Sequence, residues 1–380
     1  MRKNIFSITG ILTGTIIFSM LSFSQVSAST KSVTPMNSYR YVKKTANYQV
    51  NSTSEKYKNI WAAATKKWTS KGFKWTQKSK SKTVLSTYSD SSKSGLEVAG
   101  NCKTSYRPSD GHIYSNHVLL NRAALDKYDY TTTQRIYVAE HELGHALGLA
   151  HNNKDSISVM NPSNRYYDIQ TCDVKGMEKR YSTKISNDMV AGDDEVTVIQ
   201  YLYVKQPTLN KVKVKYKDKK ITITGEAKQI KKVRAVYNKT KKTVNVKSNK
   251  FKITLNYKNE KDIKLYGLNS KNEKITKQKK ITSSKFVTAK PICNKITHTK
   301  KGITYELNTE AGSVVTAKYK GKTIKRETVD SSYTRFFIAE KTIKGKKGKL
   351  IFTQKATSKR TSKKVACDIV KKGSAMIVSY

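Results

Sequence analysis

The sequence predicts an α+β domain followed by two all-β sandwich modules, and three observations lead to this fold class. Between residues 45 and 183, helical stripes alternate with short runs of aromatic and β-branched residues. From residue 205 onward, short β-patterned runs are separated by lysine-rich turns and show no helical period. These runs also repeat at a spacing of about 80 residues. We therefore divide the chain into residues 1–28, 29–203, 204–285 and 286–380.

Residues 1–28 are typical of a secretory signal peptide. Arg2 and Lys3 give a basic start, a long apolar run follows, and Val26–Ala28 supplies the small residues at which a signal peptidase cuts. An uncleaved membrane anchor is the alternative, although glycines, serines and threonines weaken the apolar run. The sequence predicts an exported protein that is secreted or associated with the cell wall or surface.

The first half of residues 29–203 is predicted to contain one helix and three strands. Apolar residues lie on one helical stripe across Ser52–Ser70 and predict a helix. Runs of aromatic and β-branched residues predict strands at Tyr48–Val50, Phe73–Gln77 and Thr83–Ser89. Ser91–Asp110, which carries glycine, serine and lysine, is predicted to be a loop.

The second half of this segment continues with a strand at His117–Asn121. Thr131 and Gln134 then have capping-box spacing before an apolar run, which predicts the start of a helix about two and a half turns ahead of residue 141. Asp173–Tyr181 is predicted to be a closing helix, and Val196–Val204 a strand. An acidic cluster just before that last strand is interpreted as a solvated linker, with a Ca²⁺ site as the alternative.

The stretch His141–His151 carries the chemistry, because it holds three of the six histidines of the chain. His141 and His145 are four residues apart and face the same side of a helix, so both can reach one zinc ion at about 2.0–2.1 Å. Gly148 can end the helix through a positive φ. The chain can then return His151 as a third ligand.

Glu142, beside the first ligand, is the predicted general base. Three histidines leave the fourth position of zinc to water, and a carboxylate there can take the proton of that water and pass it to a leaving amine. A histidine pair alone is more often structural, but the additional ligand and the glutamate favour a catalytic Zn²⁺ site. These residues predict the metal-assisted hydrolysis of an amide bond.

The spacing of His141–His151 resembles the long zinc motif of the metzincin metallopeptidases. Ser158–Pro162 is similar to their Met-turn, which places Met160 beneath the metal. Pro162, two residues after the methionine, resembles the matrixin branch, whereas Asn152 stands where matrixins usually have serine. The resemblance implies a metzincin-like α+β catalytic domain with a twisted sheet, an active-site helix and a C-terminal helix. It also implies that the protein is a secreted zinc-dependent endopeptidase.

The same resemblance implies where a protein or peptide substrate binds. His117–Asn121 occupies the position of the metzincin edge strand, along which an extended peptide lies. Pro162, Tyr166 and Tyr167 correspond to one wall of the primed-side specificity pocket. The short distance between residue 28 and the first strand leads us to expect no folded propeptide.

Four cysteines in an exported chain predict two disulfides. Pairing within halves, Cys102 with Cys172 and Cys293 with Cys367, is the simplest of three connectivities. Cys102 as an inhibitory thiol on the zinc is the alternative, but its neighbours lack the flanking proline and arginine of matrixin propeptides.

The second half predicts two related β modules. Val233–Tyr237 has a counterpart in Val315–Tyr319, and Phe251–Leu255 has one in Phe336–Ala339. Such strand-rich modules resemble the immunoglobulin-like modules of secreted bacterial proteins.

Charge predicts a role for these modules. Residues 204–380 hold 48 Lys and Arg against 11 Asp and Glu, a net charge of +37 out of +48 for the chain. The electrostatic field of this charge attracts polyanions. In an exported protein, the predicted polyanionic partners are cell-wall polymers or acidic glycans. Nucleic acid is not favoured, because no nucleic-acid fold signature is present. The alternative function is a surface-binding, adhesin-like protein with a vestigial peptidase domain.

Overall fold

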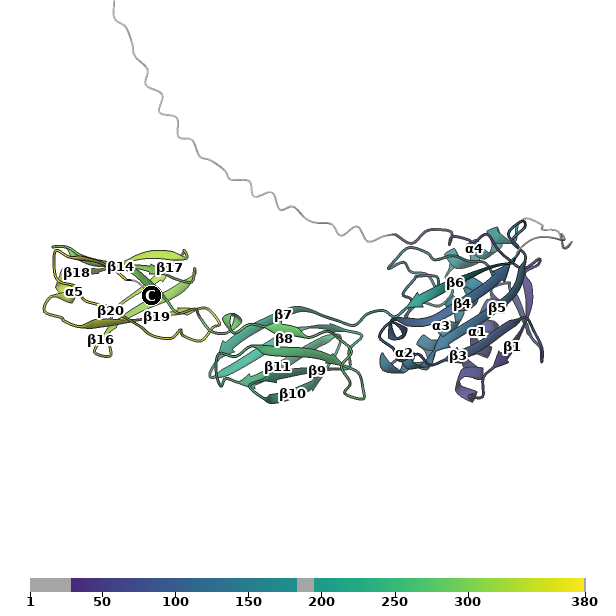
Figure 1. Ribbon diagram of the computed structural model, residues 1–380, viewed down its shortest axis with the longest axis horizontal. Coiled ribbons are helices and arrows are strands. Elements are labelled where there is room, and N and C mark those ends of the chain that lie inside the picture. Colours follow the sequence, from purple (N-terminus) through teal and green to yellow (C-terminus); the bar gives the residue numbers. More distant parts are fainter. Residues whose placement is uncertain (1–28, 183–194, 379–380) are drawn as a thin grey trace, which may run out of the picture.

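The computed structural model describes residues 29–182 and 195–378. The predicted signal peptide and residues 193 and 194 of the acidic cluster lie outside the described residues. Figure 1 shows three groups of strands that follow one another along the molecule, with nearly all helices in the first group. None of the helices within the described ranges has the length and apolar character that spanning a membrane requires.

The first group is built on a mixed six-stranded sheet with the order β2-β1-β3-β5-β4-β6. β1, β2, β3 and β5 are parallel, β4 is antiparallel to β5, and β6 is antiparallel to β4. The strand bounds are β1 Thr45–Asn51, β2 Lys74–Gln77, β3 Thr83–Tyr88, β4 Val98–Tyr106, β5 Ile113–Asn121 and β6 Val196–Tyr203.

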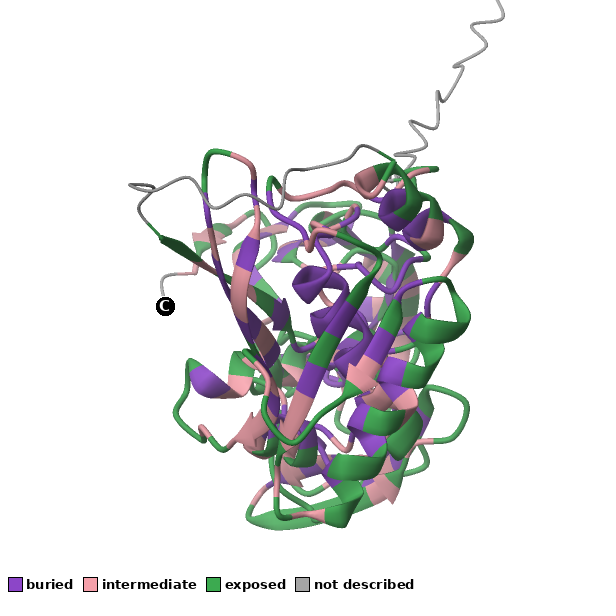
Figure 2. Ribbon diagram, turned by 90° about the vertical axis from the view of Figure 1, so that its right-hand side faces the viewer, coloured by how far each residue is buried: buried purple, intermediate pink, exposed green. Residues whose placement is uncertain are grey.

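Two long helices pack together against this sheet. The helices are α1 Glu55–Ser70, α2 Arg122–Lys127, α3 Thr132–Ala146 and α4 Thr171–Arg180, with a 3-10 turn, η1, at Gly95–Glu97. Trp68 of α1 is fully buried, and its indole N–H donates to the Glu140 carbonyl of α3 at 2.8 Å. The capping box predicted at Thr131 and Gln134 is confirmed, with both of its hydrogen bonds present. Figure 2 shows a largely buried helix behind the strands of this domain.

Two predictions about this sheet are wrong. The segment predicted as the loop Ser91–Asp110 contains β4, whose inward positions are mostly small or polar residues, such as Cys102 and Thr104, and therefore lack an apolar alternation. His117–Asn121 belongs to a strand, as predicted, but β5 lies between β3 and β4 and is not an edge. Because β4 folds back outside β5, the order of strands along the chain differs from their order in the sheet.

Each half of residues 205–378 contains two facing groups of strands. The first β module comprises β7 to β13 in sheets ordered β11-β8-β7 and β10-β9-β12-β13, and the second comprises β14 to β21 in sheets ordered β18-β15-β14-β21 and β17-β16-β19-β20. Their bounds are β7 Thr208–Lys217, β8 Lys220–Lys228, β9 Lys232–Tyr237, β10 Thr240–Asn245, β11 Lys250–Asn256, β12 Ile263–Leu268, β13 Lys279–Ile281, η2 Ser283–Lys285, β14 Ile292–His298, β15 Gly302–Asn308, β16 Ser313–Tyr319, β17 Lys322–Val329, β18 Tyr333–Ala339, α5 Glu340–Ile343, β19 Lys349–Ala356, β20 Val365–Asp368 and β21 Ala375–Ile377.

The repeat predicted from sequence has a counterpart in this topology. β9 pairs with β10 and β12, just as β16 pairs with β17 and β19. These strands contain the matching segments Val233–Tyr237 and Val315–Tyr319. The second module departs from the all-β pattern only in the single-turn helix α5, among the residues described.

Neither predicted disulfide is formed, and the four cysteines are buried thiols. The structure shows no contact between Cys102, which lies inside the sheet beside Asn116, and Cys172, which lies in the first turn of α4, so this pairing stays a prediction. Cys293 and Cys367 lie close enough to share a hydrogen bond, so a bond between them stays a prediction.

The interface of α1 and α3 contains a buried glutamate, which makes the stability of the protein depend on pH. Burial raises the pKa of Glu140, which is 0% exposed, to about 8, although nearby Lys67 opposes the shift. The folded protein therefore retains a proton that the unfolded chain loses near pH 4.5, so stability falls as the pH rises from about 4.5 through 8. We expect Glu140→Gln to remove this loss, which amounts to about 1.4 kcal/mol for each pKa unit. Urea unfolding at pH 5 and pH 9 measures it, and an equal loss of stability between these two pH values in both proteins would contradict it.

Candidate metal centre

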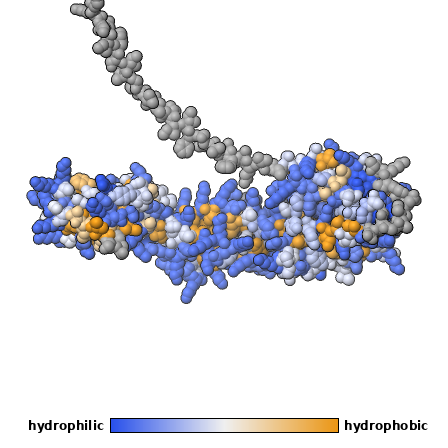
Figure 3. Space-filling model, turned by 45° about the horizontal axis from the view of Figure 1, so that its top comes forward, coloured by the Kyte–Doolittle hydropathy of each residue, from blue (hydrophilic) through white to orange (hydrophobic). Residues whose placement is uncertain are grey.

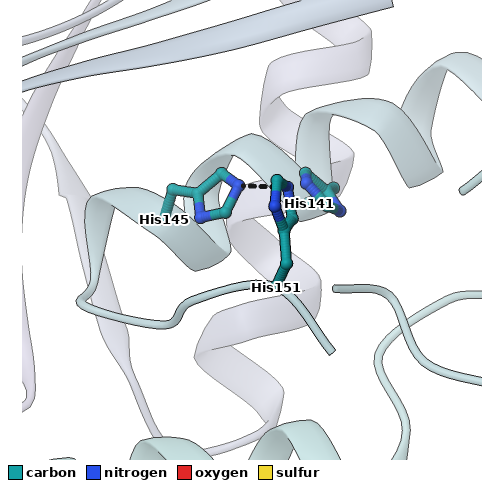
Figure 4. Close-up of side chains that lie close together, drawn as sticks. All are labelled: His141, His145 and His151. Carbon is teal, nitrogen blue, oxygen red and sulfur yellow. Dashed lines mark hydrogen bonds between the residues drawn. The ribbon is translucent and has the colours of Figure 1, made fainter. Parts of the chain in front are cut away.

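Three histidines converge at the end of α3 (Figure 4). His141 and His145 project from one face of the helix, and His151 returns from the loop that follows. One ring nitrogen from each histidine lies within 4.8 Å of the other two. The Nε2 atoms of His145 and His151 are 3.2 Å apart. The sequence-predicted ligands are thus brought together around one point.

Backbone carbonyls fix the orientation of the two helical imidazoles. Nδ1 of His141 lies 2.6 Å from the Val159 carbonyl, and Nδ1 of His145 lies 2.8 Å from the Leu149 carbonyl. Since a carbonyl only accepts, Nδ1 carries the proton in each ring and Nε2 keeps its lone pair. Nε2 of His141 is buried without a hydrogen-bond partner among the described residues. Such an orphaned lone pair is what a metal ligand presents.

Burial keeps these imidazoles neutral. It lowers the pKa of His141 and His145 well below the ordinary value, and it lowers the pKa of His151 to about 4. The neighbouring rings add to the effect on the first two. A neutral imidazole is the form that binds a metal, so the donor set fits a divalent ion with three nitrogen ligands.

Gly148 provides the turn between the second and third histidines. Its φ is +104°, and its N–H donates to the His145 carbonyl at 2.9 Å as the helix ends. A Cβ atom here would lie 2.6 Å from the Tyr39 carbonyl oxygen. Only glycine satisfies both the conformation and the close approach.

Met160 lies directly beneath the helix that carries the histidines. A Cβ on Gly144 would be 2.3 Å from the Met160 sulfur, so this glycine makes room for the methionine. The turn is held by Asp173, which accepts from the Ser158 hydroxyl at 2.6 Å and from the Val159 N–H at 2.9 Å. From sequence, Asp173 was placed only in the closing helix, and its role in holding the turn was missed. An acidic residue in the first turn of that helix was the one signal in the sequence that could have indicated this role.

Glu142 is fully buried next to the histidine cluster. Burial raises the pKa of its carboxyl well above the usual range, while the nearby amide of Leu202 opposes the shift. Neither carboxylate oxygen has a hydrogen bond of normal geometry within the described ranges. A Cβ on Gly100 of β4 would lie 2.7 Å from Oε1, so the carboxylate is wedged between α3 and β4.

The residues predicted to form the substrate pocket are spread along the segment after the Met-turn. The Pro162 carbonyl accepts from the Tyr203 N–H at 3.0 Å. Tyr166 is 46% exposed, and its hydroxyl accepts from Gln229 of the first β module at 2.9 Å. Tyr167 is partly buried. Their role in specificity stays a prediction.

The fold and the geometry of this site indicate the class of protein. A helix-borne histidine pair, a returning third histidine and an adjacent buried carboxylate form a metallopeptidase site, and metallopeptidases are hydrolases. Residues 37–182 match the model of the Peptidase_M10 family, described as Matrixin. This match supports a matrixin-like metzincin catalytic domain in residues 37–182, in agreement with the motif resemblance.

Likenesses to solved structures are weak. The BSP domain of a biofilm-associated protein has a TM-score of 0.18 at 13% identity, with 43% of this chain and 29% of that chain covered. A β-glycosidase from Bacteroides vulgatus has a TM-score of 0.19 at 11% identity, with 44% and 25% covered. The human OSCAR ligand-binding domain has a TM-score of 0.24 at 6% identity, with 43% and 97% covered. The chain spans less than a third of the first two structures, and likenesses at these scores carry no argument. No curated protein matches the sequence.

Proposed function

We propose that the protein is a secreted zinc-dependent endopeptidase. One observation carries the proposal: three neutral imidazoles direct their free nitrogens to one point beside a buried carboxylate that has no regular hydrogen-bond partner among the described residues. A histidine trio fits zinc, since it leaves a fourth position for water. A Ca²⁺ site at the acidic cluster before β6 stays a prediction, because residues 193 and 194 lie outside the described residues.

The chain's own residues divide the work of peptide hydrolysis. Bound zinc supplies a water of lowered pKa and polarises the carbonyl under attack. Glu142 takes the proton from that water and passes it to the leaving nitrogen, because its buried carboxylate adjoins the ligand His141 and has no regular hydrogen-bond partner among the described residues. The carbonyls of Val159 and Leu149 hold the ligand rings in place. Met160 supports the helix from below.

Metal removal tests the proposal directly. We expect a chelator to abolish cleavage of a denatured protein substrate, and we expect stoichiometric zinc to restore it. Product peptides identified by mass spectrometry distinguish internal cleavage from removal of terminal residues. Cleavage that persists after exhaustive chelation would contradict the assignment.

The rival function, a surface-binding protein with a vestigial peptidase domain, is not favoured. A vestigial site is expected to lose its base or one of its ligands. Here Glu142 and all three histidines are present and brought together. The rival predicts no hydrolysis by the zinc-loaded protein.

We further propose that the basic β modules attach the enzyme to an anionic surface outside the cell. Figure 3 shows hydrophilic side chains over most of the visible face of both modules, and lysines account for most of the charge there. Lysine attracts polyanions through a diffuse field, so attachment should weaken with salt.

Removing residues 290–380 is expected to weaken this attachment while peptide hydrolysis is retained. The second module has a hydrophobic core of its own, whereas the first shares a continuous core with the catalytic domain. The deletion therefore leaves the hydrophobic core that the catalytic domain shares with the first module in place. Cosedimentation with a cell-wall polyanion at 50 and 500 mM salt measures the effect, with salt-insensitive binding by both proteins as the contradicting result.

A further inference from the structure

Strand β6 covers the edge of the sheet that faces the metal centre. It runs antiparallel to β4 along its whole length, from Val196 opposite Tyr106 to Tyr203 opposite Val98. β4 would otherwise be the outermost strand on this side of the sheet. An exposed strand edge beside a peptidase site binds an extended peptide through its backbone. β6 lies in that position.

The contact between β6 and the site is at Leu202. Leu202 pairs with Gly100, and Gly100 is the residue against which the Glu142 carboxylate packs. The backbone amide of Leu202 also interacts with the Glu142 carboxyl group. The bond between Tyr201 and Leu202 therefore lies beside the carboxylate that is proposed to protonate a leaving nitrogen.

The hydrogen bonds that follow Leu202 hold the chain on both sides. The Tyr203 N–H donates to the Pro162 carbonyl at 3.0 Å, and the Val204 N–H donates to the Glu97 carbonyl at 2.8 Å. The backbone is thus held between the segment after the Met-turn and the end of η1, just before β4. This is a two-sided groove for an extended chain.

The burial pattern of β6 is that of a bound peptide more than that of an integral strand. Leu202 is 0% exposed, whereas Ile199, Tyr201 and Tyr203 are 46%, 38% and 49% exposed. No other residue of β6 is classed as buried. One side chain anchors the strand, and backbone pairing supplies the remaining contacts.

We propose that β6 is a tethered occupant of the peptide-binding groove, which presents its Tyr201–Leu202 bond to the site as a substrate does and keeps other peptides out. The inference rests on the proposed peptidase function. Any cut of this bond is a hydrolysis: water adds its oxygen to the Tyr201 carbonyl carbon, the C–N bond breaks, and Leu202 receives the proton as a new amino terminus. β6 must leave, whether cut or intact, before a second peptide can bind.

The test displaces β6 by changing its anchor. Leu202→Asp puts a carboxylate next to the buried Glu142, so the strand should leave the groove. Ile199→Asp is the matched control, because the same change falls on an exposed side chain of the same strand. In the metal-free protein we expect Leu202→Asp alone to accelerate amide hydrogen exchange in β4 and β6 by about tenfold or more, given the burial of a leucine. Thermal unfolding confirms that both variants are folded.

Two further measurements complete the experiment. A fluorescein-labelled peptide with the sequence of residues 196–206 should bind metal-free Leu202→Asp and not the wild type. With zinc, Leu202→Asp should cleave an added peptide about tenfold faster than the wild type, and any self-cleavage of the wild type should start a new chain at Leu202. Equal exchange rates and equal peptide binding by wild type and variant would overturn the proposal. Absence of hydrolysis by every variant would instead contradict the peptidase function, while exchange and binding would still decide whether β6 occupies the groove.

Discussion

Replacing Glu142 with glutamine is expected to lower peptide turnover by about 10²–10⁴-fold while leaving zinc binding intact. The amide keeps the size of the side chain but cannot take a proton from water. Because Glu142 is not a metal ligand in this arrangement, the three imidazoles should still hold the ion. Steady-state kinetics with a fluorogenic peptide, together with the zinc content of the same sample, measures both properties.

The matched control for this variant is Glu140→Gln, the same substitution two residues earlier on the same helix. Glu140 faces α1 and not the histidines, because its carboxyl lies near Lys67 of that helix. We expect it to retain turnover. Wild-type-like turnover by Glu142→Gln would refute Glu142 as the base, and equal losses in both variants would point to damage of the helix.

Gly148→Ala is expected to destabilise the catalytic domain and to weaken zinc binding together. An L residue at a φ of +104° is strained by about 1–2 kcal/mol, and the new Cβ would approach the Tyr39 carbonyl to 2.6 Å. Since that carbonyl belongs to the backbone, relief requires movement of the turn that delivers His151. Thermal unfolding and a zinc titration measure the two effects.

Gly312→Ala is the control for backbone strain alone. Gly312 has a φ of +73°, and a Cβ there would meet no atom within 4 Å. The difference between the two variants therefore isolates the steric clash at the turn. If both lose the same stability and both retain zinc affinity, the close approach to Tyr39 does not matter.

The metal ligands could be predicted from the sequence because their positions depend on residues close to them in the chain. A spacing of four places His141 and His145 on one helical face, and the capping box at Thr131 sets where that helix begins. Gly148 turns the chain within three residues, so the position of His151 follows without knowledge of the rest of the fold. Local geometry of this kind survives in the linear sequence.

The substrate side of the site was not accessible in the same way. β4 has too few apolar residues to be recognised as a strand, since its buried positions include Cys102, Thr104 and Ser105. The strand Val196–Val204 was predicted, with β6 observed at Val196–Tyr203, but its partner lies about 100 residues earlier in the chain. Nothing local specifies such a pairing. For the same reason, the assignment of β5 as the edge strand was wrong.

The modules show an intermediate case. The repeat between Val233–Tyr237 and Val315–Tyr319 was visible in sequence, and both segments lie in corresponding strands. The cysteine pairs were harder to predict, because distance along the chain does not determine distance in the fold. Proximity in the chain predicted two pairs, but only Cys293 and Cys367 lie next to each other.

X-ray absorption spectroscopy at the zinc edge, on protein loaded with one equivalent of zinc, tests the central claim most directly. We predict one tightly bound ion with three imidazole nitrogens at about 2.0–2.1 Å and one oxygen from water. Loss of one nitrogen ligand in His151→Ala should follow. A spectrum without imidazole scattering, or a protein that retains no zinc after dialysis, would contradict the account.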